Sequence, residues 1–192
     1  MKKQLYIEAA RGLAALIVVM AHFMMVFYPA SIFGGQYRAH ETWEPLFTTT
    51  PLGIFFAGQF AVCLFFILSG YVLSLPYLGL GARDNDHLLL AVVKRPFRLG
   101  GMVIASVLIA YIMLRAGVFL NTETAALTYS TPWFSQYGAP DQSGLKQFLF
   151  DIFTRPFAKG THYNSPLWTI EIELYGSFIT FGFLMIFKKS RF

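Results

Sequence analysis

Four long apolar segments alternate with short polar stretches along the chain. Each segment holds about 20 residues, and a helix that rises ~1.5 Å per residue needs that length to cross a hydrocarbon core of ~30 Å. We therefore predict an all-α membrane protein, a polytopic helical bundle with about four transmembrane helices. The predicted spans cover residues 5–28, 54–75, 99–120 and 166–187.

A fifth helix is predicted within the polar region 121–160, which is otherwise expected to form a long loop. Its apolar residues recur at the spacing of one helix face, and Pro156 ends the pattern. These apolar residues are Leu145, Phe148, Leu149, Ile152 and Phe153. We expect this amphipathic helix to lie on the membrane surface.

The composition of the 192 residues agrees with a membrane protein, because 56% are hydrophobic and only 13% are charged. The net charge of +5 does not indicate a nucleic-acid partner, since Lys and Arg stand at the ends of apolar segments instead of forming a basic face. The single cysteine, Cys63, excludes an internal disulfide. The predicted partner is therefore the lipid bilayer, and the chain is expected to form one transmembrane domain over residues 1–192.

The distribution of Lys and Arg predicts that both termini lie in the cytoplasm, because basic residues concentrate on the cytoplasmic side of membrane proteins. The inner side would hold Lys2, Lys3, Arg83, Lys94, Arg95, Arg98, Lys188, Lys189 and Arg191. The outer side would hold the smaller set Arg38, Lys146, Arg155 and Lys159.

The first span carries three ionisable residues, Glu8, Arg11 and His22, which are costly inside a bilayer. Arg11 and His22 are about three turns apart on one helix face, ~16 Å along the axis, and Glu8 lies one turn before Arg11. A neutral imidazole can take a proton from a hydroxyl, which suits acyl transfer to an alcohol. A snorkelling arginine and a histidine bonded between helices would explain the same residues.

A basic segment, residues 94–98, is expected where the third span meets the cytoplasm. Its arginines could clamp the phosphates of a cofactor, or they could serve only as the positive-inside signal. Ser69, near the inner end of the second span, is followed by a glycine that allows close approach of a helix or ligand, although packing is the commoner role.

The last span carries two carboxylates, Glu171 and Glu173, near its outer end. They are ~200° apart on a helix, so they face opposite sides and cannot share a proton. The one facing inward could orient a histidine, neutralise an arginine or simply join two helices. Patterns such as G-x-S-x-G, H-E-x-x-H and a P-loop do not occur, which argues against a serine hydrolase, a metalloprotease and an NTPase.

Four segments resemble, in order, the motifs of the membrane-bound acyltransferase-3 group of O-acyltransferases. Residues 8–22, EAARGLAALIVVMAH, resemble its first helix with an R-x10-H motif, and residues 65–74, FFILSGYVLS, resemble its F-F-x-L-S-G-[FY] segment. Residues 95–98, RPFR, match its R-x-x-R motif, and residues 167–173, LWTIEIE, match L-W-[ST]-L-x-x-E.

This resemblance implies an integral O-acyltransferase of the bacterial inner membrane that moves an acyl group, expected to be acetyl, from acyl-coenzyme A to a hydroxyl of a carbohydrate or similar acceptor. It implies that His22 and Arg11 are catalytic and that Glu173 orients His22. His22 would either deprotonate the acceptor or carry the acyl group, and both routes stay open. No metal is implied.

The resemblance also implies that Arg95 and Arg98 bind the phosphates of the donor. Supporting or substrate-binding roles fall to Glu8, Ser69 and Trp168. The chain departs from the family at Glu8, where Asp is usual, and after Glu173, where an aromatic pair is usual. It resembles the first half of a family member of about ten helices, so a missing C-terminal half is an expected partner.

A non-enzymatic protein, either half of a transporter or a scaffold whose polar stripe lines a pathway, is the alternative. Short or Gly/Pro-broken spans in matching positions would favour a transporter, and the four segments show none. Binding of acyl-coenzyme A at residues 95–98 would favour the enzyme.

Overall fold

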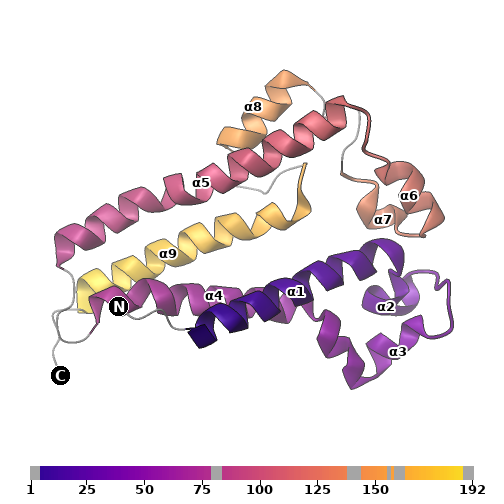
Figure 1. Ribbon diagram of the computed structural model, residues 1–192, viewed down its shortest axis with the longest axis horizontal. Coiled ribbons are helices and arrows are strands. Elements are labelled where there is room, and N and C mark those ends of the chain that lie inside the picture. The colour runs from indigo at the N-terminus through magenta and orange to yellow at the C-terminus, as the bar shows by residue number, and fades with distance from the viewer. Residues whose placement is uncertain (1–4, 79–83, 138–143, 155–156, 158–162, 188–192) are drawn as a thin grey trace. The chain divides into compact units, whose positions relative to one another are not determined.

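The computed structural model describes residues 5–78, 84–137, 144–154, 157 and 163–187, and these residues form helices and turns without a β-strand. Figure 1 shows the helices. Their bounds are α1 Leu5–Phe27, α2 Ala30–Phe33, η1 Gly34–Gln36, α3 Glu44–Thr49, η2 Pro51–Phe56, α4 Gly58–Ser74, η3 Leu75–Tyr77, α5 Asn85–Arg115, α6 Asn121–Leu127, α7 Thr131–Phe134, α8 Leu145–Phe153, η6 Ser165–Leu167 and α9 Trp168–Phe187.

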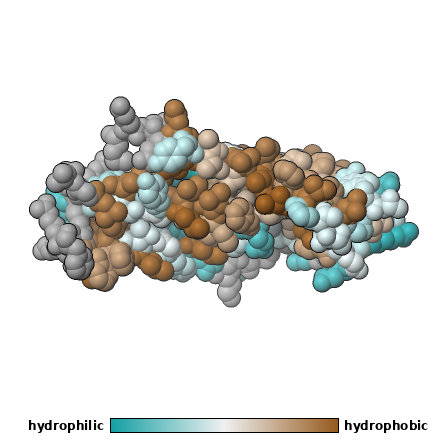
Figure 2. All heavy atoms as spheres, turned by 90° about the horizontal axis from the view of Figure 1, so that it is seen from below, coloured by the Kyte–Doolittle hydropathy of each residue, from teal (hydrophilic) through white to brown (hydrophobic). Residues whose placement is uncertain are grey.

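Four helical segments of the described chain are long and apolar enough to cross a membrane, which confirms the predicted all-α membrane fold. They are Leu5–Phe27, Gly58–Tyr77, Asn85–Arg115 and Ser165–Phe187. Apolar side chains cover much of the face drawn in Figure 2, as expected for helices in contact with lipid.

The chain divides into two compact units, which we describe one at a time. The first unit comprises Met1–Phe65 and Gly117–Ala139, and the second comprises Phe66–Ala116 and Pro140–Phe192. The prediction of one domain over residues 1–192 stays a prediction. Several basic residues used for the predicted orientation lie outside the described residues, namely Lys2, Lys3, Arg83, Arg155, Lys159, Lys188, Lys189 and Arg191.

The first unit is built on α1, which packs against α2 and η2. Of its buried side chains, Ile7, Ala14 and Ala21 recur every seventh residue, and Met24 follows about one turn after Ala21, so they mark one face of the helix. Gly58 approaches this face so closely that an added Cβ would lie 3.0 Å from the Cβ of Ala21. Small residues at both positions therefore permit the start of α4 to reach α1.

The core of the second unit is the antiparallel pair α5 and α9, which lie side by side in Figure 1. Both helices bury one stripe of residues at intervals of mostly three or four, the spacing of a single helix face. In α5 the stripe is Leu88, Arg95, Leu99, Val103, Val107 and Ala110. In α9 it is Ile170, Leu174, Ser177, Phe181 and Leu184. A charged residue and a hydroxyl thus stand in otherwise apolar stripes.

Helix α5 begins much earlier than the predicted start of the third span at residue 99. The side chain of Asp84 accepts a hydrogen bond of 3.0 Å from the backbone N–H of His87 and so caps the first turn. The helix then continues through Pro96; Leu88 before it packs in one apolar cluster with Phe181 and Leu184 of α9, and Leu99 after it is buried. The 31 residues of α5 extend about 46 Å, well beyond the hydrocarbon thickness.

Short helices occupy regions where the sequence predicts only loops. Helices α6 and α7 lie within the predicted 121–160 loop, and α2 and α3 follow α1. The predicted amphipathic helix is present as α8, with the expected bounds. Its Phe148 stacks on Tyr111 of α5, with ring centroids 4.3 Å apart, so α8 is anchored to the end of a span.

Gly53 is required by the turn between α3 and α4, because a Cβ there would lie 2.4 Å from the backbone oxygen of Phe47. We expect Gly53→Ala to lower the free energy of unfolding by about 1–3 kcal/mol, the usual cost of overpacking. Thermal unfolding in detergent measures this effect. Gly35→Ala is the matched control, since a Cβ there meets nothing within 4 Å. Equal melting temperatures for the two variants would contradict this explanation.

Tyr163 is buried beside α8, and its burial, with the charge of Asp151 and the neighbouring Tyr111, raises its pKa from 10.0 to about 12. Between these pH values the folded protein keeps a proton that the unfolded chain releases. The resulting stabilisation is therefore complete below pH 10 and is lost as the pH rises to about 12. The difference in phenolate absorbance between the wild type and Tyr163→Phe reports the ionisation of Tyr163, and we expect its midpoint near pH 12. A midpoint near pH 10 would contradict the raised pKa.

Candidate functional site

His22 lies on α1 in the first unit and is half-buried. Its Nδ1 is 2.8 Å from the carbonyl oxygen of Val18, one turn earlier on the same helix. A carbonyl oxygen only accepts hydrogen bonds, so the Nδ1 atom carries a proton. In the neutral ring the Nε2 atom then keeps the lone pair, and this atom can accept a proton from a substrate.

One wall beside His22 comes from α7, because the ring of Trp133 lies 6.3 Å from the imidazole, measured between centroids. The segment before α7 is fixed by its contacts with α6. The backbone N–H of Ser130 and the hydroxyl of Thr131 both donate to the carbonyl of Ala125, each at 3.1 Å. Sequence patterns gave no signal for Trp133, since α7 is one turn long and lies in a predicted loop.

Arg11 and Glu8, the other members of the predicted polar stripe, are both exposed on α1. Neither forms an ion pair with a described residue. The catalytic role that the resemblance implies for Arg11 stays a prediction, as does the supporting role of Glu8.

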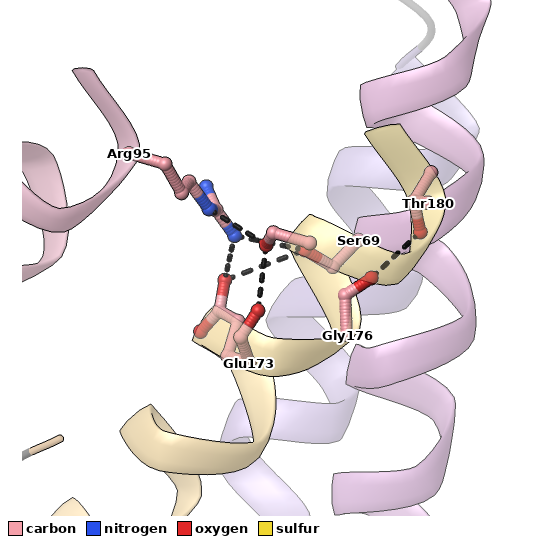
Figure 3. Close-up of polar contacts among 6 residues, drawn as sticks. Ser69, Arg95, Glu173, Gly176 and Thr180 are labelled. Atoms are coloured by element: carbon pink, nitrogen blue, oxygen red, sulfur yellow. Dashed lines mark hydrogen bonds and ion pairs between the residues drawn. The ribbon is translucent and has the colours of Figure 1, made fainter. Parts of the chain in front are cut away.

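The second unit contains an ionic network formed by Arg95 of α5 and Glu173 of α9, shown in Figure 3. The Nη2 atom of Arg95 donates to Oε1 of Glu173 at 2.6 Å. The hydroxyl of Ser69 from α4 joins them, since it accepts from Nη2 at 3.3 Å and donates to the same carboxylate oxygen at 3.3 Å. Three segments with separately predicted roles therefore meet at one point.

Ser177 completes this network, and sequence analysis missed it. The Nε atom of Arg95 donates to the Ser177 hydroxyl at 2.9 Å, and that hydroxyl donates to the backbone carbonyl of Glu173 at 2.6 Å. The signal was present, because Ser177 stands four residues after Glu173 and so lies on the same helix face. We call Ser69, Arg95, Glu173 and Ser177 the Arg95 network.

The Arg95 network lies well inside the spanning helices. Ser69 is about 12 Å from the end of its span at Tyr77, and Glu173 is about 21 Å from Phe187, counted along each helix axis. Arg95 is about 15 Å from the start of α5. Segments of 20 and 23 residues are barely longer than a hydrocarbon core, so these positions fall within it. The predicted place of Arg95, at the cytoplasmic boundary, stays a prediction, and the structure shows that Arg95 contacts Glu173 of α9.

The other predicted residues of these segments are more open. Arg98 and Lys94 are exposed and have no hydrogen-bonding or ionic partner among the residues that the structure describes. Trp168 begins α9 and is 41% exposed, and Glu171 is half-buried. No cluster of three His, Cys, Asp or Glu side chains in the described segments is placed to hold a metal ion.

The predicted pairing of Glu173 with His22 stays a prediction, because the two residues belong to different units. Within its own unit each already has a partner. The Nδ1 atom of His22 is bonded to Val18, and the carboxylate of Glu173 is bonded to Arg95 and Ser69. The roles of Arg95 and Arg98 in binding phosphates are likewise untested.

Comparison with known proteins gives a consistent assignment. A family model described as an acyltransferase domain matches residues 4–192. The chain is similar to Acyltransferase clz18 of Cochliobolus lunatus, with 26% identity, and to Acyltransferase R4 of Phoma sp., with 23% identity. Each match covers 90% of this chain and 46% of the relative, so the chain spans about half the length of these curated proteins. No solved structure matches it.

The matching model covers all the described helices, including those that carry His22 and the Arg95 network. The relatives share the acyltransferase name, and the four long apolar helices agree with an integral membrane protein. The chain therefore belongs to the acyltransferase-3 family of membrane acyltransferases.

Proposed function

We propose that this chain forms part of an integral membrane O-acyltransferase that moves an acyl group, in the first instance acetyl, from acyl-coenzyme A to a hydroxyl of a carbohydrate or similar acceptor. Family membership supports the reaction class. The chain's own geometry supports the choice of base.

The observation that carries the proposal is the hydrogen bond of 2.8 Å between Nδ1 of His22 and the carbonyl of Val18. It fixes the ring orientation and selects the tautomer with a lone pair on Nε2. The bond is made within α1 itself, so it does not depend on the placement of any other helix. A general base needs this combination of a fixed ring and a free basic nitrogen.

The proposed reaction begins when Nε2 of His22 takes the proton of the acceptor hydroxyl. The acceptor oxygen attacks the thioester carbonyl, and the C–S bond breaks as the tetrahedral adduct collapses. The departing thiolate takes the proton from Nε2, which leaves an ester, a free thiol and the original neutral imidazole. The carbonyl of Val18 stabilises the protonated ring between these steps, because both ring nitrogens then donate.

A two-step route uses the same atom. Nε2 would attack the thioester carbonyl, and the C–S bond would break to give an acyl-imidazolium and a thiolate. The acceptor hydroxyl would then attack the acyl group and lose its proton to the thiolate, which would leave an ester, a free thiol and the neutral imidazole. The Nδ1 bond to Val18 favours attack by Nε2 in this route as well, since Nδ1 has no free lone pair. Both routes assign the chemistry to one nitrogen of His22.

Arg98 and Lys94 are proposed to bind the phosphates of the donor, because both side chains are exposed cations without a described counter-ion. Arg98 offers the planar fork that suits phosphate oxygens. The donor would enter from the cytoplasm, with the N-terminus on that side, as the distribution of basic residues supports. A bacterial inner membrane stays a prediction, since the two named relatives come from fungi.

Replacement of His22 tests the proposed base. We expect His22→Ala in the full-length protein to lower acceptor acylation by about 10²–10⁴-fold, the usual contribution of a general base, with normal insertion into the membrane. His87→Ala is the matched control, because His87 is an exposed histidine at the start of α5. Acylation by radiolabelled acetyl-coenzyme A measures the effect. Wild-type activity of the His22 variant would refute the proposal.

Replacement of Arg98 tests the proposed phosphate site. A lost charge-assisted hydrogen bond is worth ~1.5–3 kcal/mol, so we expect Arg98→Ala to raise KM for acetyl-coenzyme A about tenfold or more with little change in kcat. The KM for acetyl-pantetheine, which lacks the nucleotide, should stay unchanged. Arg115→Ala, at the opposite end of α5, controls for the loss of an exposed cation. An equal rise for both donors would contradict a phosphate contact.

A further inference from the structure

The Arg95 network leaves several hydrogen-bonding atoms unused. A guanidinium has five N–H donors, and those of Nε and Nη2 are taken by Ser177, Ser69 and Glu173. The two donors of Nη1 have no partner among the described residues. Oε1 of Glu173 accepts twice, whereas Oε2 accepts from no described group.

These unused atoms are open to approach. Within the described chain, the buried polar side-chain atom that lacks a hydrogen bond is Oε2 of Glu44, far from this network in sequence. The unpaired atoms of Arg95 and Glu173 are therefore not sealed by the residues that the structure describes. The two side chains are 9% and 29% exposed, so the open side lies mainly over the carboxylate.

A phosphate is a poor ligand for this site. Glu173 neutralises Arg95 at 2.6 Å, so the pair offers no net positive charge. An anion drawn to Nη1 would be repelled by the neighbouring carboxylate. Arg98, which has no such counter-ion, lacks this disadvantage.

The site instead suits a neutral group that accepts from Nη1 and donates to Oε2. A secondary amide has both a carbonyl oxygen and an N–H, and it is costly to place in an apolar interior without partners for them. The pantetheine arm of coenzyme A carries two such amides between its nucleotide and its thioester. We propose that the Arg95–Glu173 pair binds an amide of the donor's pantetheine arm. This inference rests on the proposed function, which names the donor.

The test compares donors that differ only in their amides or their nucleotide. S-acetyl-N-acetylcysteamine carries one amide, and S-butyl thioacetate is a thioester of similar length without one. The ratio of their kcat/KM values in the full-length protein measures the contribution of the amide. The ratio for acetyl-coenzyme A over acetyl-pantetheine measures that of the nucleotide.

We expect Glu173→Gln and Arg95→Lys to lower the amide ratio about tenfold, the effect of one lost hydrogen bond to a charged group, and to leave the nucleotide ratio unchanged. Because Glu173→Gln leaves the charge of Arg95 unpaired, the double variant Arg95→Met, Glu173→Leu is included, since removal of both charges preserves folding better. The double variant should lower the amide ratio as well.

Thr180→Val is the matched control, because Thr180 lies on α9 near this site and bonds only to the carbonyl of Gly176, at 2.8 Å (Figure 3). An unchanged amide ratio in a folded double variant would overturn the inference. A lower nucleotide ratio in the variants would also overturn it, because Arg95 would then be a phosphate ligand. A variant in which only the KM of the acceptor rises would overturn it too. If the wild type used none of these donors, the proposed function would fail first, and this inference with it.

Discussion

The pairing of one guanidinium with one carboxylate inside the membrane is the constraint on which the second unit depends. Arg95 and Glu173 lie on two of the helices that are long and apolar enough to cross a membrane, where an unpaired charge is costly. Removal of one partner from a buried pair typically costs 3–5 kcal/mol, because the other charge is left without compensation. The two helices must therefore meet at this point, and Ser69 and Ser177 satisfy further donors and acceptors at the contact.

This pair also fixes the register of α5 on α9. The remaining residues of both buried stripes are mostly aliphatic side chains, which would pack almost as well after a shift of one turn. A shift of that size would separate Arg95 from both Glu173 and Ser177. A second polar contact, 2.6 Å between the Asn164 amide and the Ser106 hydroxyl, agrees with the same register. Polar contacts thus specify an alignment that apolar packing alone leaves open.

Sequence predicted the parts of the fold that depend on local pattern. Hydropathy found the four spans, and periodicity found α8, because both signals lie within one segment. The start of α5 was missed because the basic residues of segment 94–98 interrupt the apolar pattern, whereas the helix extends past them to Asn85, with Pro96 inside it. Helices as short as α7 have too few turns to show a period.

The sequence predicted most residues of the candidate sites but not the contacts between them. Ser69, Arg95 and Glu173 were each recognised from a motif, and an arginine was one of the partners left open for the inward carboxylate, yet Arg95 and Ser69 were not named as partners of Glu173. Spacing along one helix predicts which residues share a face, but it carries no information on which faces of distant helices meet. Ser177 was within reach of such reasoning, since its face is that of Glu173. Trp133 was not, because only the fold of the first unit brings it to His22.

In both candidate sites, the polar side chain has a hydrogen-bonding or ionic partner within its own unit, which lowers the cost of placing it among apolar helices. The imidazole of His22 is bonded to its own helix, and Arg95 is paired with Glu173. Each site also keeps hydrogen-bonding atoms that have no partner among the described residues. These atoms are Nε2 of His22 in the first unit, and Nη1 of Arg95 with Oε2 of Glu173 in the second. In the proposed transfer, the Val18 carbonyl is already placed to stabilise the protonated ring of His22.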